Sequence, residues 1–130
     1  MLKLAIQENP KFGIDERELA PGATGYTVDT LRSLRSEIGS ATPLYLLMGA
    51  DQYAALPTWH RPEELRKLAR IAVMARPGFK PTGGDAETVP MKPLPISATE
   101  IRARVARGES LSGLVPPAVA GYIAKHRLYS

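Results

Sequence analysis

The sequence contains no cysteine, which excludes disulfides, thiolate metal sites and cysteine nucleophiles. It also has no uninterrupted apolar run close to the ~18 residues that a membrane-spanning helix needs. The first residues, MLKLAIQENPK, interleave charged with apolar side chains and lack a small-residue cleavage site, unlike a secretory signal. These absences predict a cytoplasmic protein that does not enter a membrane.

Aromatic residues make up only 6% of the chain, and no run of basic residues exceeds two. The net charge of +4 suits either nucleic acid or a small phosphorylated ligand. A stacking platform for single strands would need more aromatic side chains than this. Nucleic acid is therefore a minor hypothesis, which would predict a steep salt dependence of binding.

Several motifs of common enzyme classes are missing. The sequence has no G-x-x-x-x-G-K-[ST], no G-x-G-x-x-G and no G-x-S-x-G, so classical NTPase, dehydrogenase and hydrolase interpretations lack support. Two histidines, His60 and His126, do not make a credible zinc site without cysteine.

The length and composition predict one globular domain. A chain of 130 residues buries roughly two thirds of its unfolded surface, and 44% hydrophobic with 23% charged residues is ordinary for such a domain. Two runs, PLYLLM at 43–48 and IAVMA at 71–75, are almost entirely apolar and are typical of strands buried on both faces. With a helical pattern between them, they predict a right-handed crossover unit and an α/β fold with a mostly parallel sheet.

The remaining elements follow from local signals of proline, glycine and periodicity. We expect helices over 28–38, 52–56, 62–69, 98–107 and 116–126, strands within 12–19 and over 88–91, and the end of a helix near the start of the chain, stopped by Pro10.

The stretch PISATEIRAR, residues 95–104, begins one of the predicted helices. Ser97 and Glu100 match the capping box S-x-x-E, a common structural motif. The same helix start offers N–H donors and a partial positive charge to an anion. Thr99 and Arg102 lie three residues apart, on neighbouring faces of the first turn. A cap needs neither of them, whereas a phosphate cradle uses both.

Ligands of open parallel sheets bind beyond the carboxyl ends of the strands. Three such ends are predicted: Gly49-Ala50-Asp51, Arg76-Pro77-Gly78 and the turn into Ser97. Asp51 either caps the next helix, which is the commoner use, or accepts hydrogen bonds from a ribose diol while Gly49 lets the ligand approach the backbone.

Aromatic residues precede the helix predicted over 62–69. Trp59 either plugs the edge of the core, the commoner use, or presents a stacking face together with His60. Thr27 precedes another helix, where backbone N–H groups are available to a small carboxylate.

Taken in chain order, these segments resemble bacterial nicotinate-nucleotide adenylyltransferases of the nucleotidyltransferase superfamily. The similarity rests on GYTVDTLRSLR (25–35), LYLLMGADQYAALPTWHRPEEL (44–65), MARPGF (74–79) and ISATEIRARVARGESLSGLVPPAVAGYIAKHRLY (96–129). It implies a Rossmann-like α/β fold and adenylyl transfer from ATP to nicotinate mononucleotide, with magnesium, giving deamido-NAD and pyrophosphate for NAD biosynthesis.

The resemblance also implies roles for the residues singled out above. In this family the I-S-x-T-x-I-R turn binds the ATP phosphates, which here corresponds to Ser97, Thr99 and Arg102, with Arg102 also stabilising charge during catalysis. Gly49 and Asp51 would line the nucleotide cleft near a ribose. Trp59 would stack on the pyridine ring, Thr27 and the His60 backbone would bind its carboxylate, and Arg76 would contact a phosphate or the substrate.

One family segment has no counterpart in the sequence. Relatives begin with a strand that ends in G-x-F-D-P-x-H-x-G-H, whose histidines hold the ATP phosphates, and this motif occurs nowhere in residues 1–130. We therefore expect a single domain that lacks its N-terminal strand and helix, exposes strand edges and has impaired turnover.

Two alternatives remain open from the sequence. One is a non-catalytic nucleotide-binding fragment or degenerate copy. The other is a sibling adenylyltransferase that acts on nicotinamide mononucleotide or pantetheine phosphate, against which the Pro57-Thr58-Trp59-His60 segment argues.

Overall fold

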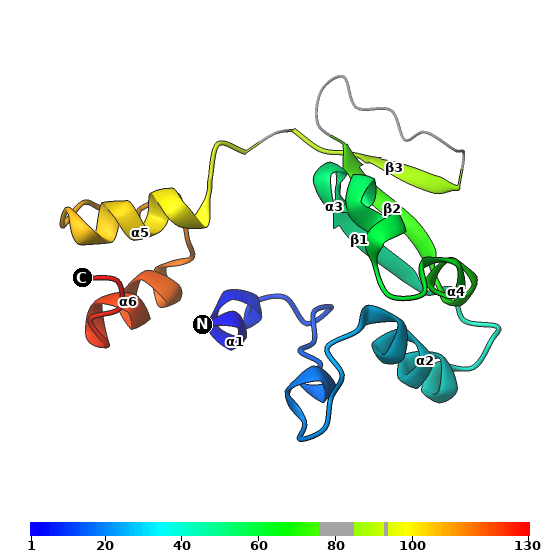
Figure 1. Cartoon of the computed structure of the whole chain (residues 1–130). Helices are drawn as coiled ribbons and strands as arrows, with labels where there is room; N and C mark the ends of the chain where they lie inside the picture. The colour runs from blue at the N-terminus through cyan, green and yellow to red at the C-terminus, as the bar shows by residue number, and fades with distance from the viewer. Residues whose placement is uncertain (76–84, 93) are drawn as a thin grey trace. The chain divides into compact units, whose positions relative to one another are not determined.

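A computed structural model describes residues 1–75, 85–92 and 94–130 (Figure 1). The chain divides into two compact units, one made of residues 1–15 and 94–130 and the other of residues 16–93. Each unit has its own set of elements and its own apolar cluster, and each is described by itself.

The unit of residues 16–93 is built on a parallel sheet. Its described strands are β1 (Tyr45–Gly49), β2 (Arg70–Ala75) and β3 (Ala86–Pro90), hydrogen-bonded in the order β1-β2-β3. Both pairs are parallel, with Met48 opposite Val73 and Val73 opposite Thr88. The predicted α/β class with a mostly parallel sheet is confirmed.

The helices of this unit begin and end at the residues that local chemistry favours. They are η1 (Arg17–Leu19), α2 (Thr27–Ile38), α3 (Ala50–Ala55), η2 (Leu56–Thr58) and α4 (Pro62–Leu68). Helix α2 ends at Gly39, whose φ of +74° suits glycine and whose N–H donates to the Arg35 carbonyl. Helix α4 has a proline at its first position, where the missing N–H costs nothing.

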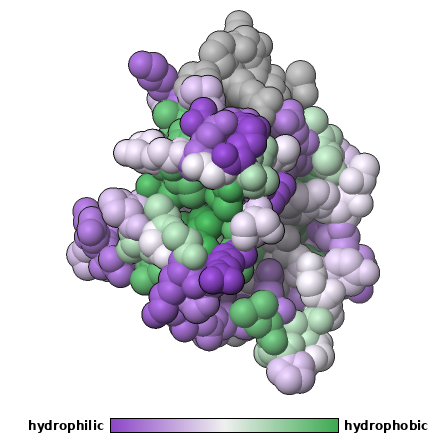
Figure 2. Space-filling model, turned by 90° about the vertical axis from the view of Figure 1, so that its left-hand side faces the viewer, coloured by the Kyte–Doolittle hydropathy of each residue, from purple (hydrophilic) through white to green (hydrophobic). Residues whose placement is uncertain are grey.

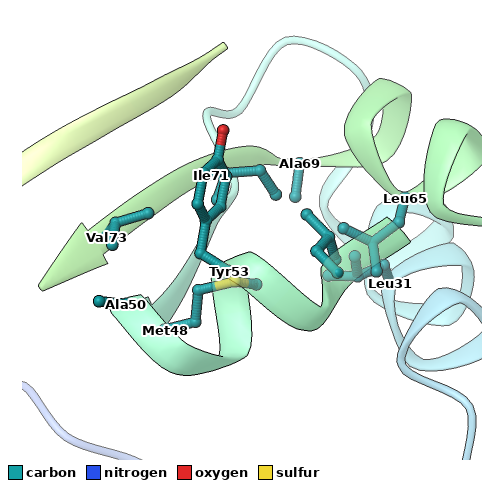
Figure 3. Close-up of a cluster of buried hydrophobic side chains, with 9 residues drawn as sticks. Leu31, Met48, Ala50, Tyr53, Leu65, Ala69, Ile71 and Val73 are labelled. Atoms are coloured by element: carbon teal, nitrogen blue, oxygen red, sulfur yellow. The ribbon is translucent and has the colours of Figure 1, made fainter. Parts of the chain in front are cut away.

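An apolar cluster joins the sheet to these helices (Figure 3). Leu56, Leu65 and Val73 are completely buried in it. Leu31 brings α2 into the same cluster, beside α4. Figure 3 also shows the Tyr53 ring inside the cluster with its hydroxyl pointing outward, where it donates to Asp85 Oδ1 at 2.6 Å. The cluster holds β1, α2 and α4 together through Met48, Leu31 and Leu65.

Two predictions about strands are wrong. Residues 12–19 form no strand, because no described strand pairs with them. They are irregular and end in the short helix η1, and the Phe12 side chain is exposed. Strand β1 is not buried on both faces, because Met48 points into the cluster while Tyr45 and Leu47 on the opposite face are exposed. Strand β2 matches the prediction, with Ile71, Ala72 and Val73 all buried.

The other unit consists of three helices and their loops. These are α1 (Leu2–Ile6), α5 (Ala98–Ala106) and α6 (Pro117–Lys125). Leu111, Val119 and Ile123 form a small apolar cluster, against which Ile101 and Val105 of α5 pack. Because these two residues lie four positions apart, they share one face of α5, which is partly buried against the cluster.

Apolar side chains also reach the surface, as the green area of Figure 2 shows. Among the large ones, Leu2, Phe12, Leu19 and Leu94 are more than 60% exposed. No helix in the described part of the chain combines the length and apolar character that a membrane crossing requires.

Candidate functional site

A cavity of about 340 Å³ opens between two loops of the sheet-containing unit. We name it the Trp59 pocket, and define it by its lining residues Gly25, Tyr26, Thr27, Thr58, Trp59 and His60. One wall precedes α2 and the other precedes α4, so segments far apart in the sequence meet here. The structure therefore brings Thr27 together with Trp59 and His60, two neighbours that the sequence did not connect with Thr27.

Aromatic rings form much of this pocket. The ring of Tyr26 stacks on that of His60, with centroids 4.1 Å apart and planes 19° from parallel. Trp59 is half-buried and packs against the core cluster, which holds it at the pocket wall. The interpretation of Trp59 as a residue that closes the edge of the core is confirmed, and the same side chain also lines the cavity.

Helix α2 begins at the pocket. Thr27 occupies its first position, and the residue before it, Tyr26, supplies no side-chain cap. The first N–H groups of an α-helix have no partner within the helix, and its N-terminus carries a partial positive charge. The pocket therefore presents hydrogen-bond donors and a favourable field to an anionic group beside an aromatic wall.

A second group of predicted site residues lies at the start of α5, in the other unit. Ser97 caps the helix, its Oγ accepting the Glu100 N–H at 3.1 Å. Arg102 donates to Thr99 Oγ1 at 3.4 Å. Only half of the predicted capping box forms, because the Glu100 carboxylate accepts from Arg104 at 2.9 Å instead of turning back to Ser97.

Among the described residues, Arg102 forms no ion pair. Arg104 is paired with Glu100, and Arg107 is paired with Glu109 at 2.6 Å, whereas Arg102 has no carboxylate partner there. Arg102 and Thr99 are both exposed. This turn is available to bind an anion.

The remaining predicted residues lie at strand ends. Gly49 ends β1 and is itself the cap residue of α3, its N–H donating to Gln52 Oε1 at 3.2 Å. Asp51 is exposed in the first turn of α3, so the interpretation of Asp51 as the helix cap is wrong, because the helix already starts at Ala50. Arg76 lies outside the described residues.

An ion-pair network that the sequence did not predict joins α2 and α4. Arg32 binds Glu64 through two hydrogen bonds and Asp29 through a third. The hydrogen bond from Thr24 is the main cause that lowers the pKa of Asp29, and the hydrogen bond from Arg32 is the main cause that lowers the pKa of Glu64. Only the Asp29 and Arg32 pair, three residues apart on one helix, could have been recognised from the sequence.

Comparison with known proteins gives these features a context. A family model described as "Cytidylyltransferase-like" matches residues 1–104. Proteins named "Probable nicotinate-nucleotide adenylyltransferase" from Chromobacterium violaceum, Laribacter hongkongensis and Salinispora arenicola are 40%, 41% and 40% identical to the chain. Each alignment covers 99% of this chain and 72%, 69% and 71% of the relative.

The chain belongs to the nicotinate-nucleotide adenylyltransferase family, within the cytidylyltransferase-like group. Its parallel sheet with flanking helices is consistent with the Rossmann-like nucleotidyltransferase fold that the sequence predicted. In this family member, the described residues contain no group of three His, Asp or Glu side chains that could hold a metal ion.

Proposed function

We propose that this chain transfers the adenylyl group of ATP to nicotinate mononucleotide, giving deamido-NAD and pyrophosphate in NAD biosynthesis. The relatives that carry the name nicotinate-nucleotide adenylyltransferase support this reaction class. The observation that carries the substrate assignment is the Trp59 pocket, which combines an aromatic wall with the amino end of α2.

A pyridine ring with a carboxylate matches this combination. Trp59 offers the stacking face, and its fixed position against the core reduces the entropy lost on binding. The carboxylate would accept hydrogen bonds from Thr27 and from the His60 backbone, in the favourable field of α2. A carboxamide has no charge to gain from that field, so the pocket should prefer nicotinate to nicotinamide.

The ATP site in this proposal uses the turn that begins α5. At the start of α5, Ser97, Thr99 and Arg102 bind phosphates. In the unit of residues 16–93, Gly49 and Asp51 contact a ribose. Arg76 contacts a phosphate or the pyridine nucleotide. The exposed, uncommitted guanidinium of Arg102 supports this assignment, since arginine binds phosphate through two parallel hydrogen bonds.

The reaction needs no covalent intermediate with the protein. A phosphate oxygen of nicotinate mononucleotide attacks the α-phosphorus of ATP, and the bond from that phosphorus to the bridging oxygen breaks in line, so that pyrophosphate leaves. Arg102 and the amino end of α5 stabilise the negative charge that grows on the leaving group. Magnesium, when bound with ATP, would neutralise phosphate charge.

The test is an assay for deamido-NAD with this chain, ATP, magnesium and either nicotinate or nicotinamide mononucleotide. We expect deamido-NAD and pyrophosphate in equal amounts, and a higher kcat/KM for the nicotinate substrate. Preference for the amide, or for pantetheine phosphate, would identify a sibling adenylyltransferase instead. Binding of the nucleotides with no product would support the alternative of a non-catalytic nucleotide-binding fragment.

A further inference from the structure

The two walls of the Trp59 pocket are carried by different helices. Residues 25–27 lead into α2 and residues 58–60 lead into α4, so the shape of the pocket depends on how α2 lies against α4. Leu31 and Leu65 are buried where these helices meet. Apolar contacts of this kind are not directional, and alone they would tolerate small shifts along the helix axes.

The side chain of Arg32 adds directional hydrogen bonds to this contact. We call the Arg32 guanidinium and its two carboxylate partners, Asp29 and Glu64, the fork. Arg32 Nε and Nη2 donate to the two carboxylate oxygens of Glu64 at 2.5 and 2.6 Å. The third branch, Arg32 Nη1, donates to Asp29 Oδ1 at 2.6 Å, and the other oxygen of Asp29 accepts from Thr24 Oγ1 at 2.7 Å. Because the guanidinium is planar and its donors have fixed directions, this arrangement favours the observed register of α2 on α4.

A hydrogen bond on the α2 side and an ion pair on the α4 side connect the fork to the two walls of the pocket. On the α2 side, Thr24 Oγ1 also accepts the N–H of Tyr26 at 3.2 Å, which ties the fork to the wall that carries Thr27. On the α4 side, Glu64 lies 3.6 Å from Nη1 of Arg61, the residue that follows His60. The backbone of Arg61 has a φ of +51°, which is uncommon for residues other than glycine. This backbone conformation sets the direction in which the chain enters α4.

The fork also controls charge beside the pocket. Asp29 lies two residues after the pocket residue Thr27, and Glu64 lies four residues after the pocket residue His60. Without a cation between them, these carboxylates would repel a substrate carboxylate. Arg32 contacts both and offsets their charge.

We propose that Arg32 and Glu64 are positioning residues for the nicotinate site, which hold the Thr27 and His60 walls at the spacing that a pyridine carboxylate requires. This inference rests on the proposed function. Neither side chain lines the pocket, so both act through the backbone of the residues that do.

The test uses the single tryptophan of the chain, Trp59, as an intrinsic fluorescent reporter. Nicotinate mononucleotide and nicotinamide mononucleotide are each titrated into the full chain, and Kd is taken from the change in Trp59 emission. We expect Arg32→Met to weaken nicotinate mononucleotide about tenfold or more and to reduce the preference for it over the amide. Glu64→Gln keeps the side-chain shape but removes the negative charge that the fork needs. It should likewise weaken binding of nicotinate mononucleotide and reduce the preference for it over the amide.

Two further variants separate positioning from charge and from general stability. Arg32→Lys keeps the positive charge without the fork, so the weakened binding should persist; recovery of full affinity would overturn the positioning role. Arg107→Met is the matched control, because Arg107 makes a similar two-bond contact with Glu109 at the far end of α5, in the other unit. It should leave both dissociation constants unchanged.

The outcomes distinguish this inference from the function on which it rests. If the unaltered chain binds neither pyridine nucleotide, or prefers the amide, the proposed substrate is wrong and the inference falls with it. If the unaltered chain prefers nicotinate mononucleotide and Arg32→Met and Glu64→Gln bind it equally well while far-UV circular dichroism shows them folded, only the inference is refuted. Equal loss of affinity in the Arg107→Met control would also refute it.

Discussion

At the scale of single residues, the partners of the arginines on α5 differ, and this difference separates a candidate ligand-binding arginine, Arg102, from arginines that stabilise the helix. Other arginines of α5 and its C-terminal end are held by Glu100 or Glu109, whereas Arg102 contacts only the Thr99 hydroxyl among the described residues. An arginine kept free of carboxylates has more binding energy available for phosphate, because no ion pair has to break first. Its removal should therefore affect ligand binding and leave folding almost unchanged.

We predict that Arg102→Ala weakens ATP binding about tenfold or more, since a hydrogen bond to a charged group contributes about 1.5–3 kcal/mol. Isothermal titration calorimetry of ATP with the two proteins measures the change. Arg107→Ala is the control, since its ion pair with Glu109 lies at the opposite end of the same helix. Equal ATP affinities for Arg102→Ala and the unaltered chain would contradict the role proposed for this guanidinium.

At the scale of elements, one arginine fastens the C-terminal ends of α2 and α4. Arg35 Nη1 donates to the carbonyls of Gly39 and Thr42 at 3.1 and 2.6 Å. Its Nε and Nη2 both donate to the carbonyl of Leu68, the last residue of α4, at 3.2 and 2.5 Å. Helix ends leave such carbonyls without partners, so Arg35 replaces several missing hydrogen bonds at once.

We predict that Arg35→Met lowers the free energy of unfolding by about 2 kcal/mol, from the loss of several hydrogen bonds of about 1 kcal/mol each. Urea unfolding followed by circular dichroism measures it. Arg35→Lys should recover only a small part, because an ammonium group cannot reach carbonyls on both sides in the same way. Lys67→Met, at an exposed position close by on α4, should change the value by less than about 0.5 kcal/mol.

The elements themselves show which parts of the fold can be predicted from sequence. The predicted boundaries of the helices over 27–38, 62–68 and 117–125 differ from the observed ones by no more than one residue. Glycine and proline act locally on the backbone, so a short stretch of sequence is enough to place these boundaries. The strand expected within 12–19 failed, since a strand forms only with a partner, and weak alternation carries no information about one. For the same reason the apolar run of β1 did not reveal that one of its faces is exposed.

The candidate site shows the same division at smaller scale. Ser97, Thr99 and Arg102 are neighbours in sequence, and their closeness on one helical turn followed from spacing alone. The Trp59 pocket needed the fold, because its two walls are joined only through the packing of α2 on α4. The fork between Arg32 and Glu64 joins residues 32 positions apart, and no local pattern indicates that pairing.

At the scale of the whole molecule, carboxylates in both units are stabilised in their charged form. The pKa of Asp29 is lowered mainly by the Thr24 hydrogen bond, that of Glu64 by the Arg32 hydrogen bond, and that of Glu109 by the Arg107 hydrogen bond. Each group therefore binds a proton less readily in the folded chain than in the unfolded chain. Its contribution to stability is present above the ordinary carboxyl pKa of about 4 and is lost as the pH falls through the lower, folded-state value.

The melting temperature should therefore stay nearly constant from pH 7 to about pH 5 and fall below about pH 4, where the unfolded chain takes up protons first. Thermal circular dichroism at several pH values measures this, at low salt, because high salt screens exposed ion pairs. The double variant Glu64→Gln with Glu109→Gln removes two of the titrating groups, so its melting temperature should be lower at pH 7 and fall less steeply in acid. A melting temperature that rises on acidification, or an equally steep fall in the double variant, would show that these carboxylates do not couple folding to protons.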